Sequence, residues 1–201
     1  MAKYDVSVEK ILKIECRAVS GLITSLDREI TDRVIDLLLR VKPEGHKVIT
    51  AGCGTSGTVA RRVAHTLSVV EVPAFYCSPA NSIHGGMGAI QKGDVVVLFS
   101  KGGNTPEILN YIPCCKEKGA KIIGVSQNDD SVLAKESDIY FKIEVGEESD
   151  KFNMCASASC TATIAAWDAV AFTIMDVSGY TKKDLLLTHP GGKVGEMLRS
   201  H

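Results

Sequence analysis

Two loops of this sequence combine glycine with hydroxyl side chains, the residue types that bind anions. The first, residues 52–57, is G-C-G-T-S-G, and the second, residues 100–105, is S-K-G-G-N-T and is followed by Pro106. Glycine lets backbone amides approach an anion closely, hydroxyls add donors, and a helix N-terminus favours negative charge. We therefore predict that these loops bind a phosphate. The predicted phosphate-binding residues are Gly54, Thr55, Ser56, Ser100, Gly103, Asn104 and Thr105.

Four ionisable residues in loops could move protons beside such a phosphate: His84, Glu107, Glu148 and His189. Each also has a plain interpretation as a charged surface residue, and Glu107 as a favourable charge at a helix start. An imidazole and a carboxylate next to a bound sugar phosphate are suited to transferring a proton between adjacent carbons. Which of the four abstracts the proton stays open at this point.

The elements that must position these loops form a repeating pattern. Short apolar runs at residues 48–51, 74–77, 95–99, 122–125 and 139–143 lack polar alternation, as strands covered on both faces do. Helical segments at residues 57–70, 106–118 and 131–136 separate them. This alternation predicts an α/β fold with a doubly wound parallel sheet, in which ligands bind at the carboxyl ends of the strands.

Helices are also predicted at both ends of the chain. Apolar residues recur at helical spacing from residue 8 to 41, interrupted by Gly21, which predicts two helices or one bent helix ending at residues 43–45. Residues 157–177 form a last helix that is apolar on most faces and must be buried in the core or at a subunit interface. Hydroxyls at its start can cap free amides. We expect a single domain over residues 1–201, with a helical segment, residues 1–45, packed on the sheet.

Charge and hydropathy exclude several classes of function. Lys and Arg number 23 against 24 Asp and Glu, and they are scattered, so we expect no nucleic-acid partner. No signal peptide is evident and no apolar run approaches the roughly 20 residues that span a bilayer, so we expect a cytoplasmic protein without a membrane partner. Residues 52–57 match G-x-G-x-x-G, but residues 76–79, Y-C-S-P, lack the acidic residue that binds a ribose. We therefore expect no dinucleotide cofactor.

Several motifs together resemble the sugar isomerase (SIS) domain of the arabinose-5-phosphate isomerase family. They are the two loops, I-H-G at residues 83–85, the Ser/Thr-rich start of the last helix, and above all L-T-H-P-G-G-K-V-G at residues 187–195. The resemblance implies a five-stranded, flavodoxin-like three-layer sandwich and interconversion of an aldose phosphate and a ketose phosphate through an enediol. It also implies a homotetramer or homodimer in which His189 reaches a neighbour's site. It carries over His84, Glu107, Glu148 and His189 as catalytic or site-shaping groups.

The sequence departs from the family pattern at three positions. Thr55 stands where the family has a lysine, which removes a positive charge, and Gly102 stands where it has a serine, although Lys101 adds a charge nearby. Ser78 replaces a histidine that can bind inhibitory zinc, so we predict no metal. Family members commonly carry C-terminal CBS modules, which we expect to be absent here.

Two other hypotheses remain beside an isomerase. One is a non-catalytic module that binds or senses a sugar phosphate, which Thr55 favours. The other is a purely structural subunit whose second loop is a plain turn before a helix. The second is the weaker one, because two phosphate-type loops would then lack a purpose.

Overall fold

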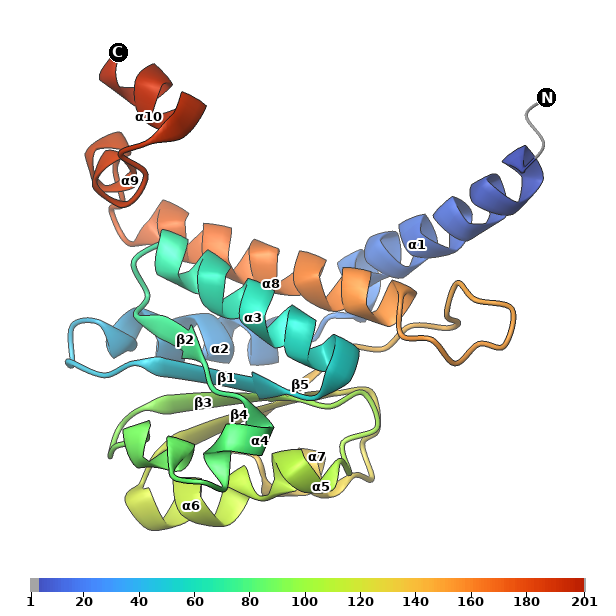
Figure 1. Cartoon of the computed structure of the whole chain (residues 1–201), viewed down its shortest axis with the longest axis horizontal. Helices are drawn as coiled ribbons and strands as arrows, with labels where there is room; N and C mark the ends of the chain where they lie inside the picture. Colours follow the sequence, from blue (N-terminus) through green and yellow to red (C-terminus); the bar gives the residue numbers. More distant parts are fainter. Residues whose placement is uncertain (1–3, 201) are drawn as a thin grey trace.

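The computed structural model describes residues 4–200, and they form a five-stranded parallel sheet of order β2-β1-β3-β4-β5 (Figure 1). The strands are β1 (Val48–Gly52), β2 (Ala74–Tyr76), β3 (Val95–Phe99), β4 (Lys121–Ser126) and β5 (Ile139–Lys142). All five lie where the apolar runs predicted them. The sheet order is that of flavodoxin-like folds, so the predicted doubly wound architecture is confirmed. The ends of the predicted domain, residues 1–3 and 201, lie outside the described residues.

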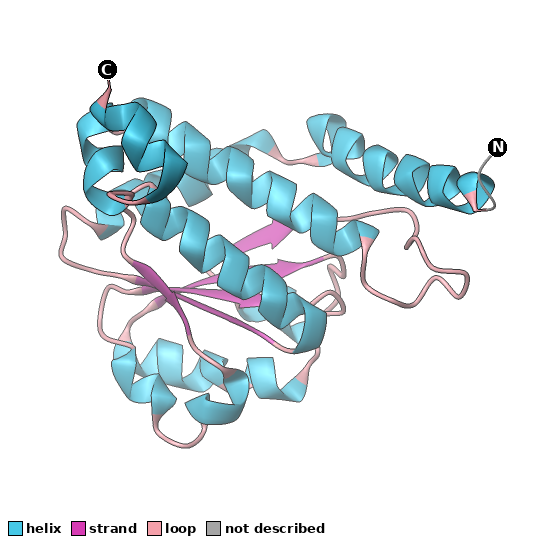
Figure 2. Ribbon diagram, turned by 45° about the horizontal axis from the view of Figure 1, so that its top comes forward, coloured by secondary structure: helices cyan, strands magenta, loops and turns pink. Residues whose placement is uncertain are grey.

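Helices cover both faces of the sheet and make three layers (Figure 2). One face carries α2 (Arg28–Val41), α3 (Gly54–Val69) and α8 (Ala158–Val177). The other carries α4 (Pro79–Ser82), the 3-10 helix η1 (Gly86–Ala89), α5 (Pro106–Leu109), α6 (Tyr111–Lys118) and α7 (Val132–Glu136). Outside these layers, α1 (Asp5–Ser25) packs on α8 and projects from the body, and α9 (Lys182–Thr188) and α10 (Gly192–Arg199) follow α8.

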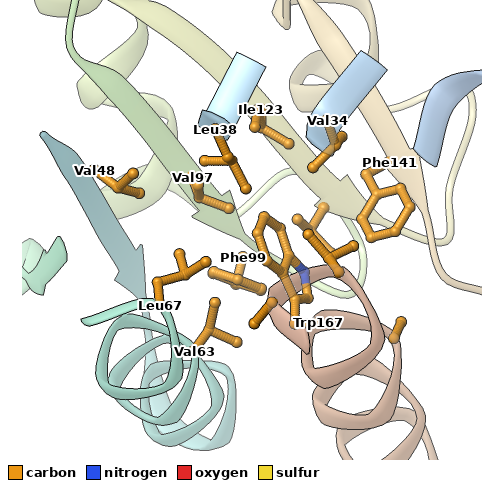
Figure 3. Packing of buried hydrophobic residues seen from close by; sticks show 14 of the residues in the cluster. Val34, Leu38, Val48, Val63, Leu67, Val97, Phe99, Ile123, Phe141 and Trp167 are labelled. Carbon is orange, nitrogen blue, oxygen red and sulfur yellow. The ribbon is translucent and has the colours of Figure 1, made fainter. Parts of the chain in front are cut away.

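A buried aromatic cluster joins α8 to the sheet. The Trp167 ring lies 5.7 Å, centroid to centroid, from each of Phe99 on β3 and Phe141 on β5. Val34 and Leu38 of α2 close over it, as Figure 3 shows. Each ring removes a large apolar area from water, so this cluster fixes α8 against β3 and β5.

By length and composition alone, α8 could cross a membrane, because its 20 residues include a window of mean hydropathy 1.3. This corrects the expectation that no apolar run approaches bilayer length. The helix instead packs against α1, α2 and α3, and Ala162, Ala166, Trp167 and Val170 are buried. It is a core helix, which was one of the two positions predicted from the sequence, the other being a subunit interface.

The N-terminal break lies at a different residue from the predicted one. The first helix, α1, runs through Gly21 and ends at Ser25, and α2 begins after Asp27, whose Oδ1 accepts a hydrogen bond of 3.0 Å from the Ile30 amide. A helical glycine costs only about 1 kcal/mol relative to alanine, whereas an aspartate cap actively starts a new helix. The break between the two helices therefore lies at the Asp27 cap and not at Gly21.

The segment predicted as one helix, residues 106–118, is divided into α5 and α6. Pro113 explains the break, because its ring lacks an N–H for the Leu109 carbonyl and clashes with that carbonyl in a continuous helix. Four short helices, α4, η1, α9 and α10, were not predicted. The signal for α9 was present as a capping box, in which Thr181 and Asp184 bond each other's backbone amides.

Candidate functional site

Both predicted phosphate loops leave the sheet from neighbouring strands. Along their whole length β1 pairs with β3, from Val48 opposite Val95 to Gly52 opposite Phe99. The chain then turns to opposite faces, because α3 follows β1 on one face and α5 follows β3 on the other (Figure 1). This is the topological switch point of the sheet, where open α/β folds bind ligands. Tertiary structure thus brings the two loops together at one edge.

The first loop leaves the N-terminus of α3 open. Its N-cap residue, Cys53, makes no side-chain cap bond, whereas Asp27 and Ser131 cap α2 and α7. The amides of Gly54, Thr55 and Ser56 are the first of the helix and have no carbonyl of an earlier turn to bond. They can donate together to one anion at the positive end of the helix dipole.

The second loop holds its hydroxyls in a fixed arrangement. Ser100 Oγ and Thr105 Oγ1 are 2.8 Å apart, and the Gly103 amide donates to Ser100 Oγ at 3.1 Å. Gly103 has φ +71°, and a Cβ there would lie 2.2 Å from Ser131 Oγ. Asn104 is turned toward α7, where its Oδ1 accepts from the Val132 amide at 2.9 Å. The loop is preorganised by its own contacts.

A small cleft opens between the loops, β4 and the start of α8. Its lining is mostly hydroxyl, amide and short apolar groups, with Lys101 as the one charged side chain among the described residues that line it. Gln127 Oε1 is buried there and has no donor in the described chain. The lining residues are Ser56, Val59, Phe99, Ser100, Lys101, Val125, Ser126, Gln127, Ile143, Ala156, Ser159, Cys160 and Thr163. Such a set of donors and acceptors suits a polyhydroxylated anion.

Glu148 lies under this cleft and is 2% exposed. Its carboxylate accepts from the Ser157 amide at 2.9 Å, the Ser159 amide at 3.1 Å, both serine hydroxyls and Lys101 Nζ. Burial alone would raise the pKa of Glu148, but the hydrogen bonds from Lys101, Ser159 and the amides outweigh burial and lower the pKa to about 2. Glu148 is therefore an ionised cap of α8 and a partner of Lys101.

Two of the predicted acid-base residues are exposed in segments that follow strands at the same edge of the sheet. Glu107 lies in the first turn of α5. Its carboxylate is near the first loop, since it is the second cause, after burial, that raises the pKa of the Cys53 thiol. His84 is exposed between α4 and η1, in the connection that follows β2, the neighbour of β1. Both side chains are open to a ligand entering from solvent.

His189 lies at the other end of the protomer. It ends α9, and Tyr180 Oη, just before α9, donates to the carbonyl of Val69, the last residue of α3. The first phosphate loop lies at the opposite end of α3, roughly 24 Å away for a helix of 16 residues. Figure 1 shows the same separation between α9 and the loops. The protomer alone does not bring His189 to its own cleft.

Comparisons with known proteins agree on one family. The family model of the SIS domain matches residues 43–173. The chain is 33% identical to arabinose 5-phosphate isomerase KdsD of Pseudomonas aeruginosa and 34% identical to arabinose 5-phosphate isomerase KpsF of Escherichia coli CFT073, each over 96% of this chain. It spans 58% of the length of both relatives.

Solved structures are similar over nearly the whole chain. A candidate sugar-phosphate isomerase from Listeria monocytogenes is 40% identical, with a TM-score of 0.91, over 95% of this chain and 100% of that one. A protein of Escherichia coli CFT073 in complex with a sugar phosphate is 31% identical, with a TM-score of 0.88, over 94% of this chain and 100% of that one. The fold and its helical layers are therefore shared with these proteins.

The left-handed backbone of Gly103 predicts a sharp difference between two adjacent glycines. Gly103→Ala should lower the free energy of unfolding by roughly 2–4 kcal/mol, because it adds backbone strain and a clash with Ser131. Gly102→Ala, where a Cβ meets nothing within 4 Å, should change it by less than about 0.5 kcal/mol. Urea unfolding measures both, and equal effects would contradict the loop geometry.

The hydrogen bonds of Glu148 predict a pH-dependent stability. Because folding lowers its pKa from 4.5 to about 2, its stabilisation is present above pH 4.5 and is lost as the pH falls toward 2. Glu148→Gln should lower the free energy of unfolding, measured with denaturant, by about 3 kcal/mol at pH 7 and by less than half of that at pH 3. The matched control is Glu147→Gln, with a side chain 51% exposed. A pH-independent difference for Glu148→Gln would contradict the assignment.

Proposed function

The chain belongs to the SIS domain family, and from that premise we propose that it is a sugar-phosphate isomerase that interconverts an aldose phosphate and a ketose phosphate through an enediol. The observation that carries the proposal is the pair of phosphate-type loops at the β1/β3 switch point, beside a cleft lined with hydroxyls. The relatives named arabinose 5-phosphate isomerase support a substrate of the arabinose 5-phosphate and ribulose 5-phosphate type.

In this proposal the phosphate lies against the open N-terminus of α3. The amides of Gly54, Thr55 and Ser56 donate to its oxygens, and the hydroxyls of Ser56, Ser100 and Thr105 add donors from both loops. A sugar extending from this phosphate then occupies the cleft toward α8. The loops fix the sugar's position, which is what a proton transfer between two adjacent carbons requires.

We assign the proton transfer to Glu107 rather than to Glu148. A general base needs a lone pair that is free to take a proton from the substrate. Glu148 is saturated by five hydrogen bonds and has a pKa of about 2, whereas the Glu107 carboxylate is exposed beside the first loop. His84 lies in the connection that follows β2, the neighbour of β1, and its imidazole can form hydrogen bonds with the sugar oxygens.

His189 enters the proposal through a second copy of the chain. Because α9 holds it at the far end of its own protomer, a homotetramer or homodimer would place it in a neighbour's cleft. Exposed apolar side chains on the projecting helices support assembly, since such surface is costly in water. They include Val8 and Leu12 on α1 and Val194 and Met197 on α10.

A second candidate function is a module that binds a sugar phosphate without turning it over. Thr55 and Gly102 favour it, because they leave the two loops without a lysine and a serine that the family pattern contains. Separate measurements of sugar-phosphate binding and of turnover distinguish the two candidates, because only the isomerase does both.

We expect the purified protein to exchange deuterium from solvent into C1 or C2 of arabinose 5-phosphate, ribulose 5-phosphate or a hexose phosphate. Glu107→Gln should lower kcat by about 100-fold or more and leave the Kd within about threefold, because the base acts only in the chemical step. The control Glu117→Gln, on the exposed face of α6, should behave as wild type. Binding without any exchange, by NMR, would favour the non-catalytic module.

Mixing two inactive variants tests whether His189 acts in a neighbour. Glu107→Gln and His189→Ala, each nearly inactive alone, should regain about a quarter of wild-type activity when co-expressed, because random assembly gives that share of sites both intact groups. Either variant co-expressed with itself is the control. No recovery, or a monomer by light scattering, would contradict action in a neighbouring subunit.

A further inference from the structure

Lys101 occupies an unusual place for a lysine in a surface loop. It belongs to the second phosphate loop, yet its side chain is 35% exposed and turns inward to pair with the buried Glu148. Its backbone is also fixed, because its carbonyl accepts from the Gln127 amide of β4's following loop at 3.1 Å. The ammonium therefore has a defined position on the wall of the cleft.

Within the ion pair, the Lys101 ammonium keeps N–H donors that can bind a ligand. Glu148 keeps four other donors, namely the amides and hydroxyls of Ser157 and Ser159, so its carboxylate stays hydrogen-bonded while the Lys101 ammonium also contacts a ligand. An ammonium has three N–H donors, and the contact with Glu148 uses one of them. The remaining donors can reach an anion in the cleft that Lys101 lines.

The position of Lys101 matters for the charge balance of the cleft. A phosphate monoester brings nearly two negative charges at neutral pH into a cleft that already lies over the ionised Glu148. Two like charges separated by a few ångströms repel strongly where water is scarce. Lys101 lies on the cleft wall and touches Glu148, and no other charged residue of the described chain is among those that line the cleft.

We propose that Lys101 is the cation of this site and binds the phosphate of the ligand directly, with Glu148 fixing its ammonium beside the cleft. The inference rests on the proposed function for the class of ligand, a sugar phosphate. It accounts for how the site carries a positive charge although the first loop has Thr55. Ammonium-phosphate bonds are charge-assisted and roughly twice as strong as neutral ones.

The test is equilibrium binding, which needs no turnover. The Kd values of inorganic phosphate and of arabinose 5-phosphate are measured by calorimetry for wild type, Lys101→Met, Lys101→Arg and Lys92→Met. Lys92 is exposed just before β3, at the amino edge of the sheet, and its loss changes the net charge equally. We expect Lys101→Met to raise both Kd values at least tenfold and to flatten their salt dependence. Lys101→Arg should stay within about threefold, and Lys92→Met should be unchanged.

Unchanged Kd values in Lys101→Met would overturn the proposal, as would a lower kcat with unchanged Kd, which would place Lys101 at the reacting carbons instead. Rescue by Lys101→Arg, with circular dichroism and unfolding of each variant, separates lost charge from lost folding. Weaker phosphate binding by Lys101→Met, in a protein that turns over no sugar phosphate, would support Lys101 and refute the isomerase proposal alone.

Discussion

The buried carboxylate of Glu148 connects parts of the molecule that the chain itself keeps far apart. It caps the start of α8 through the amides of Ser157 and Ser159, and it holds Lys101 of the second phosphate loop. Its burial is tolerated because five hydrogen bonds replace the water it loses. The register of α8 on the sheet, set by Trp167, and the position of the loop are therefore tied to one ionised group.

Around that group the sheet order decides where chemistry can happen. Because β1 and β3 are neighbours and their following helices lie on opposite faces, their two loops flank one cleft. Asp27 and Ser131 cap α2 and α7 with their side chains, while α3 leaves its first amides free. Amides left free at a helix start are available to an anion, which is the role proposed for them here.

The four predicted acid-base residues separate into three kinds of position. Glu107 and His84 are exposed at the edge where the loops lie, Glu148 is enclosed beneath it, and His189 is at the far end of α3. The H-P-G-G-x-x-G motif has a structural reason of its own there, because a Cβ at Gly195 would lie 2.7 Å from the His189 carbonyl. The motif thus shapes a tight turn between His189 and α10.

Local patterns in the sequence determined the five strands, most helices, the two anion-type loops and the family resemblance, because hydrophobic period and turn chemistry act over a few residues. They failed where one local signal competed with another, as at Gly21 and Asp27, or where Pro113 divided a helix. Only the tertiary structure decided that Glu148 caps α8 across nine and eleven residues, that Lys101 turns inward, and that His189 stands apart. Those outcomes depend on which groups the packed sheet and helices bring within hydrogen-bond distance, and no spacing along the chain records that.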